Sequence, residues 1–492
     1  MGLSVTARSG LLLAAPKILQ AAIAAAMDYY TYKLAGKIYG CRSKAAYAAL
    51  CLTVFSPWQA FCSVRTLSNS LETTLTIFAL NMLPWNWFLG AERTKGKDKR
   101  ATASATTKAS SASLYASLAT AALACILRPT NIIIWATISI TLLIRNGNVS
   151  KLLGLAQAAL LSGGAVLAAS ISADRVFYDA WILPPLRFMQ FNLVQSLAVF
   201  YGVNRPDYYL TEGLPLLLIT ALPFAAVGLW QSFRVRSQNA STGTANECEI
   251  RFTLATAVVS TVVTLSLISH KEVRFIYPLL PILQIVAAKP LAAFFSPFPR
   301  PDKKFKQALL LLLICANALI GWYAVFVHQR GVVDVVHFLR NSHEASIKER
   351  SPATHPDHEA QRTAVGFLMP CHSTPWRSHL VHLEIDAWAL TCEPPLNFTL
   401  EERKTYMDEA DVFYDNPFDW LQNNMGEGEP GLRPWPEYLV FFEQLERQLI
   451  SWIPSSAYKQ CWRGFNTHFH DDWRRKGDVI VWCATDGPDD LL

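Results

Sequence analysis

Long apolar segments alternate with short polar loops over the first two thirds of the chain. A helix needs roughly 20 apolar residues to cross a bilayer, so each long segment predicts one transmembrane helix. The pattern predicts about ten such helices, with the fourth and fifth unusually short. The apolar segments are residues 10–36, 43–62, 71–90, 112–127, 131–145, 152–172, 213–233, 252–269, 275–296 and 307–327.

Composition agrees with this pattern. Hydrophobic residues make up 51% of the sequence and charged residues only 17%. That balance is typical of a membrane protein and excludes an ordinary soluble enzyme. The net charge of +6 is modest, and the basic residues gather in short loops. The sequence therefore gives no reason to expect a nucleic-acid partner.

The loops form two sets that alternate along the chain. The basic set contains residues 37–44, 93–108, 145–151, 234–251 and 300–306. The other set, rich in specific polar and aromatic residues, contains residues 65–69, 128–131, 173–212 and 270–274. Because basic loops face the cytosol, the second set is predicted to face the opposite compartment.

The character of the chain changes near residue 328. We predict a polytopic transmembrane domain over residues 1–328 and a soluble domain of mixed α and β structure over residues 329–492. Counting of crossings places the soluble domain opposite the cytosol. The sequon at Asn397 is then accessible to glycosylation, whereas the sequons at Asn148 and Asn239 should stay unmodified.

The cysteines and histidines of the soluble domain are compatible with disulfides or with a zinc site. Its four cysteines permit one or two disulfides, and the sequence does not give their connectivity. They are Cys371, Cys392, Cys461 and Cys483. His372, His379 and His382 lie near Cys371, but their spacing fits no established zinc pattern. We therefore predict no metal site.

His270-Lys271-Glu272-Val273-Arg274-Phe275 places four ionisable side chains between two apolar segments. The connection is too short for a solvated loop, and charge beside hydrocarbon is costly unless it is paired or binds a charged ligand. The cations suit a phosphate, with arginine as the bidentate partner, and Glu272 suits a cation or a sugar hydroxyl. The alternative is a plain charged cap whose lysine and arginine extend to the interface.

Three further stretches also place polar or charged residues at the ends of apolar segments. Residues 65–72 open the third apolar segment, where Arg65 either extends to the interface or belongs to a site. Residues 128–131 contain a proline that breaks a helix, and Arg128 at that depth needs a partner. Residues 174–181 combine an ion pair with aromatic residues of an interfacial belt. Together these stretches predict a polar cavity at the membrane surface, beside a lipid-linked ligand.

The stretch from His270 to Phe275 resembles the HKExRF signature of membrane mannosyltransferases that use dolichyl-phosphate mannose. These enzymes form glycosyltransferase family 22, of the GT-C class. Residues 65–72, 128–131 and 174–181 resemble other stretches of the same family. Residues 367–375 and 408–420 are similar to the branch that adds the third mannose of the glycosylphosphatidylinositol (GPI) anchor. The resemblance covers about residues 8–485.

The resemblance implies a mostly α, GT-C type fold with a lumenal C-terminal domain, in the endoplasmic reticulum membrane. It implies an inverting α1,2-mannosyltransferase that takes mannose from dolichyl-phosphate mannose, acts on a GPI precursor and needs no cofactor or metal. Lys271 and Arg274 would stabilise the departing phosphate, with assistance from His270. The donor and substrate site would comprise His270, Lys271, Glu272, Arg274, Arg65, Asn69, Arg128, Asn131 and Tyr178.

The chain departs from the family at its beginning. The family's expected catalytic Asp lies in an acidic lumenal loop after a first membrane span, and Met1 falls beyond that loop. We expect the base upstream of Met1, in a chain cut at its N-terminus. Within the chain, Asp174 is a weak substitute and Asp28 lies near the cytosolic side.

Four alternatives remain beside the active, truncated transferase. They are a catalytically inactive accessory homologue, a transferase whose base comes from elsewhere, a mannosyltransferase of the N-glycan pathway and a transporter of lipid-linked substrates. The transporter is disfavoured because the hydropathy shows no internal repeat.

Overall fold

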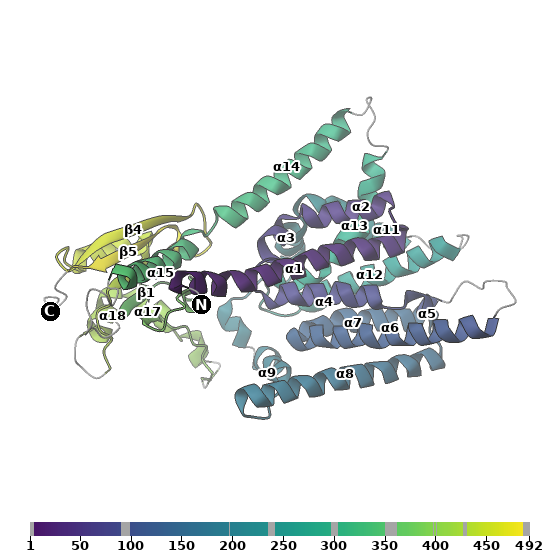
Figure 1. The fold of residues 1–492 in the computed structure, drawn as a ribbon, viewed down its shortest axis with the longest axis horizontal. Coiled ribbons are helices and arrows are strands. Elements are labelled where there is room, and N and C mark those ends of the chain that lie inside the picture. The colour runs from purple at the N-terminus through teal and green to yellow at the C-terminus, as the bar shows by residue number, and fades with distance from the viewer. Residues whose placement is uncertain are drawn as a thin grey trace. The chain divides into compact units, whose positions relative to one another are not determined.

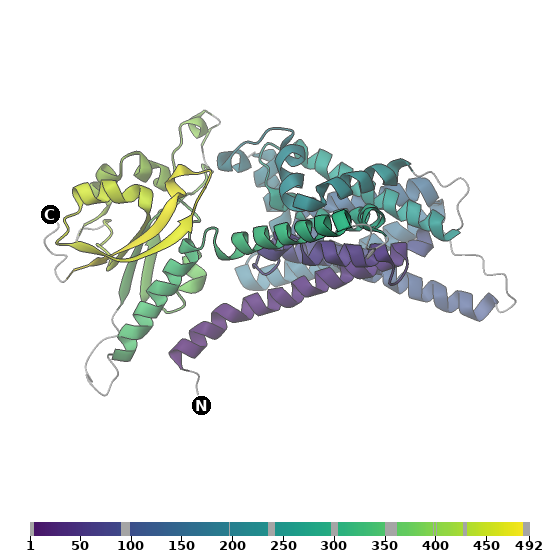
Figure 2. The same ribbon diagram turned by 90° about the horizontal axis from the view of Figure 1, so that it is seen from above.

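The chain folds into two compact units (Figures 1 and 2). One unit comprises Lys17–Gly321, and the other joins Met1–Pro16 to Trp322–Leu492. The predicted domain boundary at residue 328 stays a prediction. The computed structural model describes residues 4–89, 99–195, 197–234, 242–296, 304–349, 362–396, 398–399, 401–426 and 431–485.

The first two thirds of the chain are helical, as the apolar pattern predicts. The longer helices are α1 (Val5–Tyr39), α2 (Lys44–Val54), α4 (Ser68–Met82), α6 (Lys99–Leu127), α7 (Ile132–Asn146), α8 (Val149–Tyr178), α11 (Leu222–Arg234), α12 (Thr242–Ser266), α13 (Leu280–Phe295) and α14 (Lys304–Phe326). Shorter pieces join them: α3 (Pro57–Cys62), α5 (Trp85–Leu89), η1 (Pro129–Asn131), α9 (Pro184–Met189), η2 (Gln190–Val194), η3 (Leu197–Tyr201), η4 (Tyr209–Gly213), α10 (Leu214–Leu218), η5 (Ile219–Ala221) and η6 (Val273–Leu279).

Proline and serine set several of the breaks. The Ser56 hydroxyl accepts a hydrogen bond from the backbone N–H of Gln59, and Pro57 occupies the first position of α3. This combination starts a new helix, because the cap satisfies a free donor and proline is preset for the first turn. The break predicted at Pro129 is confirmed, since α6 ends at Leu127 and η1 begins at Pro129.

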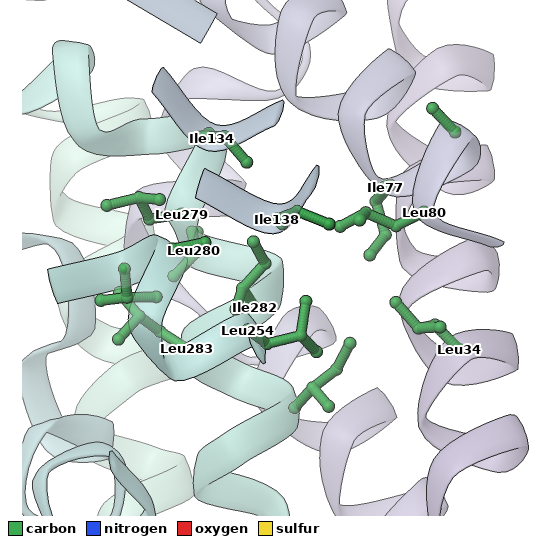
Figure 3. Close-up of a cluster of buried hydrophobic side chains, with 14 of the residues drawn as sticks. Leu34, Ile77, Leu80, Ile134, Ile138, Leu254, Leu279, Leu280, Ile282 and Leu283 are labelled. Carbon is green, nitrogen blue, oxygen red and sulfur yellow. The ribbon is translucent and has the colours of Figure 1, made fainter. Parts of the chain in front are cut away.

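Helix α13 forms the centre of the Lys17–Gly321 unit. It packs against α2 and α11, and α6 packs between α4 and α8 (Figure 1). A Cβ at Gly228 would lie 2.2 Å from the Val286 carbonyl oxygen, so α11 and α13 touch backbone to backbone. Such close approach through small residues is typical of membrane helices. The core side chains in Figure 3 include Leu34, Ile77, Leu80, Ile134, Ile138, Leu254, Leu279, Leu280, Ile282 and Leu283.

Seven helical stretches among the described residues are long and apolar enough to cross a membrane. They are 5–39, 110–127, 149–178, 209–234, 245–266, 273–295 and 304–348, and 44–54 and 129–145 are shorter apolar helices. The prediction of about ten spans is not confirmed. Breaks at Ser56 and near Pro84 leave α2 and α4 too short to count. Outward-facing leucines such as Leu160 and Leu319 suit contact with lipid, as expected of a multi-pass membrane protein.

The C-terminal unit contains a five-stranded mixed sheet. Its strands are β1 (Thr363–Leu368), β2 (Ile385–Ala389), β3 (Tyr438–Phe442), β4 (Tyr458–Thr467) and β5 (Gly477–Ala484), in the order β2-β1-β3-β5-β4. Strand β1 is parallel to β2 and β3, whereas β3, β5 and β4 pair antiparallel. The helical elements are α15 (Gly331–Glu349), α16 (Trp376–His379), η8 (Glu402–Lys404), α17 (Glu409–Asp415), α18 (Pro417–Asn424), α19 (Glu443–Trp452) and η9 (Trp473–Arg475).

Both faces of this sheet are covered by helices. Val440 and Val481 pack in one cluster with Val335 of α15. Phe441 and Ile480, one position along each strand, pack in another cluster with residues of α17, α18 and α19. Alternation along the strands therefore separates two cores. The predicted mixed α and β domain is confirmed.

Two disulfides close the domain, and they decide a pairing that the sequence leaves open. Cys371 bonds to Cys392, and Cys461 bonds to Cys483. The second bond joins the neighbouring antiparallel strands β4 and β5. The pairing of Cys371 with another cysteine also removes its thiolate as a ligand beside His372.

Candidate functional site

Glu272 is the centre of an ion network between α12 and η6. Both of its oxygens face Arg274, with Oε1 2.7 Å from Nη2 and Oε2 2.5 Å from Nε. His270 Nε2 lies 3.2 Å from Oε1. Paired donors on one carboxylate hold the guanidinium plane in a fixed orientation.

The network shifts two pKa values in opposite directions. Burial alone would raise the pKa of Glu272, but hydrogen bonds from His270 and Arg274 outweigh it and lower that pKa to about 2. The hydrogen bond to Glu272 raises the pKa of His270 above its usual value, against the effect of burial. Glu272 is therefore ionised at neutral pH, and His270 holds its proton more readily than a free histidine.

Gly202 and Asn204, in the connection before η4, contact His270 and Lys271. His270 Nδ1 lies 3.0 Å from the Gly202 carbonyl oxygen, so both ring nitrogens face oxygen acceptors. The Lys271 backbone N–H donates to Asn204 Oδ1, and its Nζ donates to the Asn204 carbonyl oxygen over 3.2 Å. Two acceptors on one imidazole suit the protonated ring, which is a donor at both nitrogens.

A second carboxylate, Glu72 of α4, is buried and only 2% exposed. Asn131 Nδ2 donates to its Oε1 over 2.9 Å, and Asn69 Nδ2 lies 3.3 Å from its Oε2. The Asn69 amide also donates to the Arg274 carbonyl oxygen over 3.1 Å. Glu72 thereby links α4, η1 and η6.

Arg128 lies near enough to both carboxylates to interact with them electrostatically. Its guanidinium carbon lies 5.4 Å from the centre of the Phe275 ring. Burial lowers the pKa of Arg128, and the Glu72 and Glu272 carboxylates work against that shift. An arginine stays charged even so, which makes Arg128 a second fixed cation beside Arg274.

The structure thus brings together most of the predicted site residues, but it separates two of them. Arg65 donates from Nε to the Phe61 carbonyl oxygen and lies 3.9 Å from the Phe61 ring centre. Tyr178 is exposed, and its ring packs on Phe177. No hydrogen bond or ion pair within the described ranges joins Arg65 or Tyr178 to the network around Glu272 and Glu72.

The two carboxylates considered as substitute bases also lie elsewhere. Asp174 is half-buried near the end of α8, and the described part of the chain contains no hydrogen bond or ion pair from it to the Glu272 network. Asp28 of α1 accepts from Gln59 Nε2 over 3.4 Å.

Comparison with known proteins decides the family. Residues 3–381 match the Alg9-like mannosyltransferase family. The chain belongs to this family. A protein named GPI mannosyltransferase 3 from Aspergillus fumigatus is 44% identical over 98% of the chain and 67% of its own length. Proteins of the same name from Gibberella zeae and Yarrowia lipolytica are 41% and 39% identical over 96% and 95% of the chain, which spans 81% of each.

Among solved structures, two crystal structures of ArnT from Cupriavidus metallidurans are similar to this mannosyltransferase. The apo form has a TM-score of 0.49 and covers 94% of this chain and 83% of its own. The form bound to undecaprenyl phosphate has a TM-score of 0.47 and covers 95% of this chain and 83% of its own. Both are 13% identical in sequence.

Three residues of this mannosyltransferase that contact the predicted site residues had no role predicted from the sequence. Glu72 carries a usable signal, because a carboxylate one turn after Asn69 in an apolar helix is costly unless it is paired. Gly202 and Asn204 carry no such signal. Their contacts with His270 and Lys271 depend on how the connection folds back over a distance of 67 or 68 positions.

The arrangement suits an anionic ligand. Arg274 keeps 45% of its side chain exposed although Glu272 orients it. Lys271, in contrast, is only 4% exposed and is directed to the Asn204 backbone. The accessible positive charge is therefore that of Arg274, with Arg128 and protonated His270 close to it.

Proposed function

We propose that this chain transfers mannose from dolichyl-phosphate mannose to the GPI-anchor precursor, as its third mannose. The names of the relatives from A. fumigatus, G. zeae and Y. lipolytica support the reaction. The resemblance of residues 367–375 and 408–420 to the same branch supports the acceptor. The reaction takes place at the lumenal face of the endoplasmic reticulum membrane, and both substrates are lipid-linked.

The bidentate pair of Arg274 with Glu272 is the observation that carries this proposal. Transfer breaks the bond between the anomeric carbon and the phosphate oxygen, and the electron pair stays on the phosphate. A guanidinium held in place by a carboxylate can donate its outer N–H groups to that phosphate without having to reorganise. Arg128 and protonated His270 add positive charge at the same place.

Lys271 has a different role in this proposal. Its Nζ and its backbone N–H both engage Asn204, and its side chain is buried. These contacts support a positioning role, in which Lys271 holds the connection that also carries Gly202 against His270. The direct contact of Lys271 with phosphate stays a prediction from the sequence.

The acceptor hydroxyl attacks the face opposite to the phosphate, so the anomeric configuration inverts, and a carboxylate base takes the hydroxyl proton. Glu72 is a poor base because both of its oxygens already accept amide hydrogen bonds and its side chain is buried. Within this chain, Asp174 stays the weak candidate for that base, predicted from the sequence. No cofactor or metal enters this mechanism.

An assay with defined acceptors tests the proposal. The purified chain is incubated with dolichyl-phosphate mannose and with GPI intermediates that carry one, two or three mannoses. We expect mass spectrometry to show one added hexose on the two-mannose acceptor alone. An exomannosidase specific for α1,2 links should remove it.

Other products of the assay would contradict this assignment. Transfer to a lipid-linked N-glycan precursor would favour the N-glycan pathway. Absence of transfer to every acceptor, from protein that elutes as a single folded species, would favour an accessory homologue.

A further inference from the structure

Two histidines and a glutamate converge in the C-terminal unit, in a place that the transferase mechanism does not use. His343 belongs to α15, and His382 and Glu384 lie in the segment just before strand β2. One ligand atom from each of the three residues lies within 4.8 Å of the others. The centres of the two imidazole rings are 5.3 Å apart.

His343 presents one nitrogen without a partner. Its Nδ1 lies 2.9 Å from the Thr363 hydroxyl oxygen. Its Nε2 is buried and has no hydrogen-bond partner among the described residues, and the residue is only 2% exposed. A buried polar atom left unpaired costs about 1–3 kcal/mol, so this one needs an explanation. A Nδ1–H directed to Thr363 leaves the Nε2 lone pair free for a metal ion.

His382 is oriented by a carboxylate. Its Nε2 lies 3.0 Å from Glu344 Oε1, which leaves Nδ1 as its coordinating atom. Glu344 is itself held, because Ser9 donates a hydroxyl hydrogen bond of 2.6 Å to the same oxygen. A carboxylate on the second nitrogen of a metal-binding histidine fixes the ring and makes it a better ligand.

We propose that His343, His382 and Glu384 bind one Zn²⁺ ion, with water at the fourth position. Two imidazoles and one carboxylate form an established ligand set for zinc. Bonds to zinc of about 2.0–2.2 Å require the three ligand atoms to gather around one ion, and the segment before β2 supplies two of them. His382 and Glu384 are half-buried, which gives the ion a way in.

The site differs from the histidine set that the sequence suggests. Only His382 belongs both to the proposed zinc site and to the group of histidines near Cys371. Cys371 itself is in a disulfide with Cys392. Strand β2 is at the edge of the sheet. Zinc would therefore fasten this edge to α15, and its role is to stabilise the domain, separate from mannose transfer.

Zinc binding to the full chain tests the proposal. The detergent-solubilised protein is stripped with a chelator, dialysed against Zn²⁺ and analysed for metal content, and its thermal unfolding is recorded at increasing Zn²⁺. We expect about one zinc per chain and a Tm that rises with zinc concentration. Absence of zinc from folded wild-type protein would overturn the proposal.

Variants separate the proposed site from other histidines. Glu384→Gln keeps the side-chain size at a half-buried position, and His343→Gln removes the buried ligand. Both should lose the zinc and the zinc-dependent rise in Tm. The matched control is His372→Asn, which removes an exposed histidine at a position of positive φ that asparagine tolerates. Retention of zinc by folded Glu384→Gln, or its loss from His372→Asn, would contradict the assignment.

Discussion

Asn131 and Glu72 lie 59 positions apart in the sequence and are joined by a buried hydrogen bond of 2.9 Å. Asn69 donates to the second oxygen of the same carboxylate and also to the Arg274 backbone. Through these hydrogen bonds, Glu72 links α4 and η1 to the segment that contains Arg274.

Removal of the Glu72 carboxylate should destabilise the membrane unit. In Glu72→Ala, the amides of Asn69 and Asn131 lose their acceptor, at a cost of about 1–3 kcal/mol for each buried donor left unpaired. Glu72→Gln retains one acceptor oxygen and should cost less. Thermal unfolding in detergent measures both variants, with the exposed Glu212→Ala as the control. A Glu72→Ala protein as stable as this control would contradict the linking role.

Replacement of Arg274 should slow transfer without unfolding the protein. Loss of a preorganised donor to a developing negative charge typically costs on the order of 10²–10³ in kcat, which we expect for Arg274→Gln. Arg274→Lys should recover part of the loss, since it keeps the charge but not the paired geometry. Arg205→Gln removes an exposed arginine paired with Asp207 and should leave kcat unchanged. Equal rates for the Arg274 and Arg205 variants would rule out the phosphate role.

The pH profile should report the protonation of His270. Its pKa is raised by Glu272, so the protonated ring persists above the usual pH range and is lost only as pH rises through the raised value. We expect kcat to fall on that alkaline side. Glu272→Gln removes the carboxylate and should move the fall to lower pH. If the alkaline midpoint of the kcat profile is unchanged in Glu272→Gln, the profile does not report the His270–Glu272 pair.

The same pair predicts how stability depends on pH. His270 contributes stability that is complete below its unfolded pKa and is lost as pH rises through its folded pKa. Glu272 does the opposite, because its folded pKa is about 2: its contribution is complete above its unfolded pKa and is lost as pH falls toward 2. Thermal unfolding across pH, compared between wild type and His270→Asn, should show the alkaline loss only in the wild type.

The disulfide between β4 and β5 should stabilise the soluble domain. Its cysteines are 22 positions apart, and closure of a loop of that size contributes about 3 kcal/mol. The double variant Cys461→Ser/Cys483→Ser should therefore show a lower Tm, whereas Cys315→Ser alters an exposed free cysteine and should not. Peptide mapping without reductant checks the pairing. A peptide that joins Cys371 to Cys461 would refute it.

Glycosylation tests the membrane orientation. The sequons at Asn397 and Asn239 lie outside the described residues, and the prediction for each rests on the loop charges. Asn397 should be glycosylated and Asn239 should not, as seen from a glycosidase-sensitive mobility shift that disappears in Asn397→Gln. The reverse pattern would invert the orientation.

Sequence alone determined the features that depend on local pattern. Hydrophobic runs gave the helices because the backbone of each segment must satisfy its own hydrogen bonds in lipid. The charged stretch from His270 to Arg274 was recognisable because ionised groups beside hydrocarbon need partners. The two polar stretches around Asn69 and Asn131 were also predicted to share its surroundings, and the structure brings them together.

Tertiary structure decided which partner each group received. Glu72 accepts hydrogen bonds from both Asn69 and Asn131. Lys271 donates to the Asn204 backbone, and the His343 ring lies close to the His382 ring. The cysteine pairing was decided in the same way. Each of these outcomes depends on contacts between positions that are remote in sequence. The free energy of such contacts is set by packing and burial, so the periodicity of hydrophobic residues along the chain does not predict them.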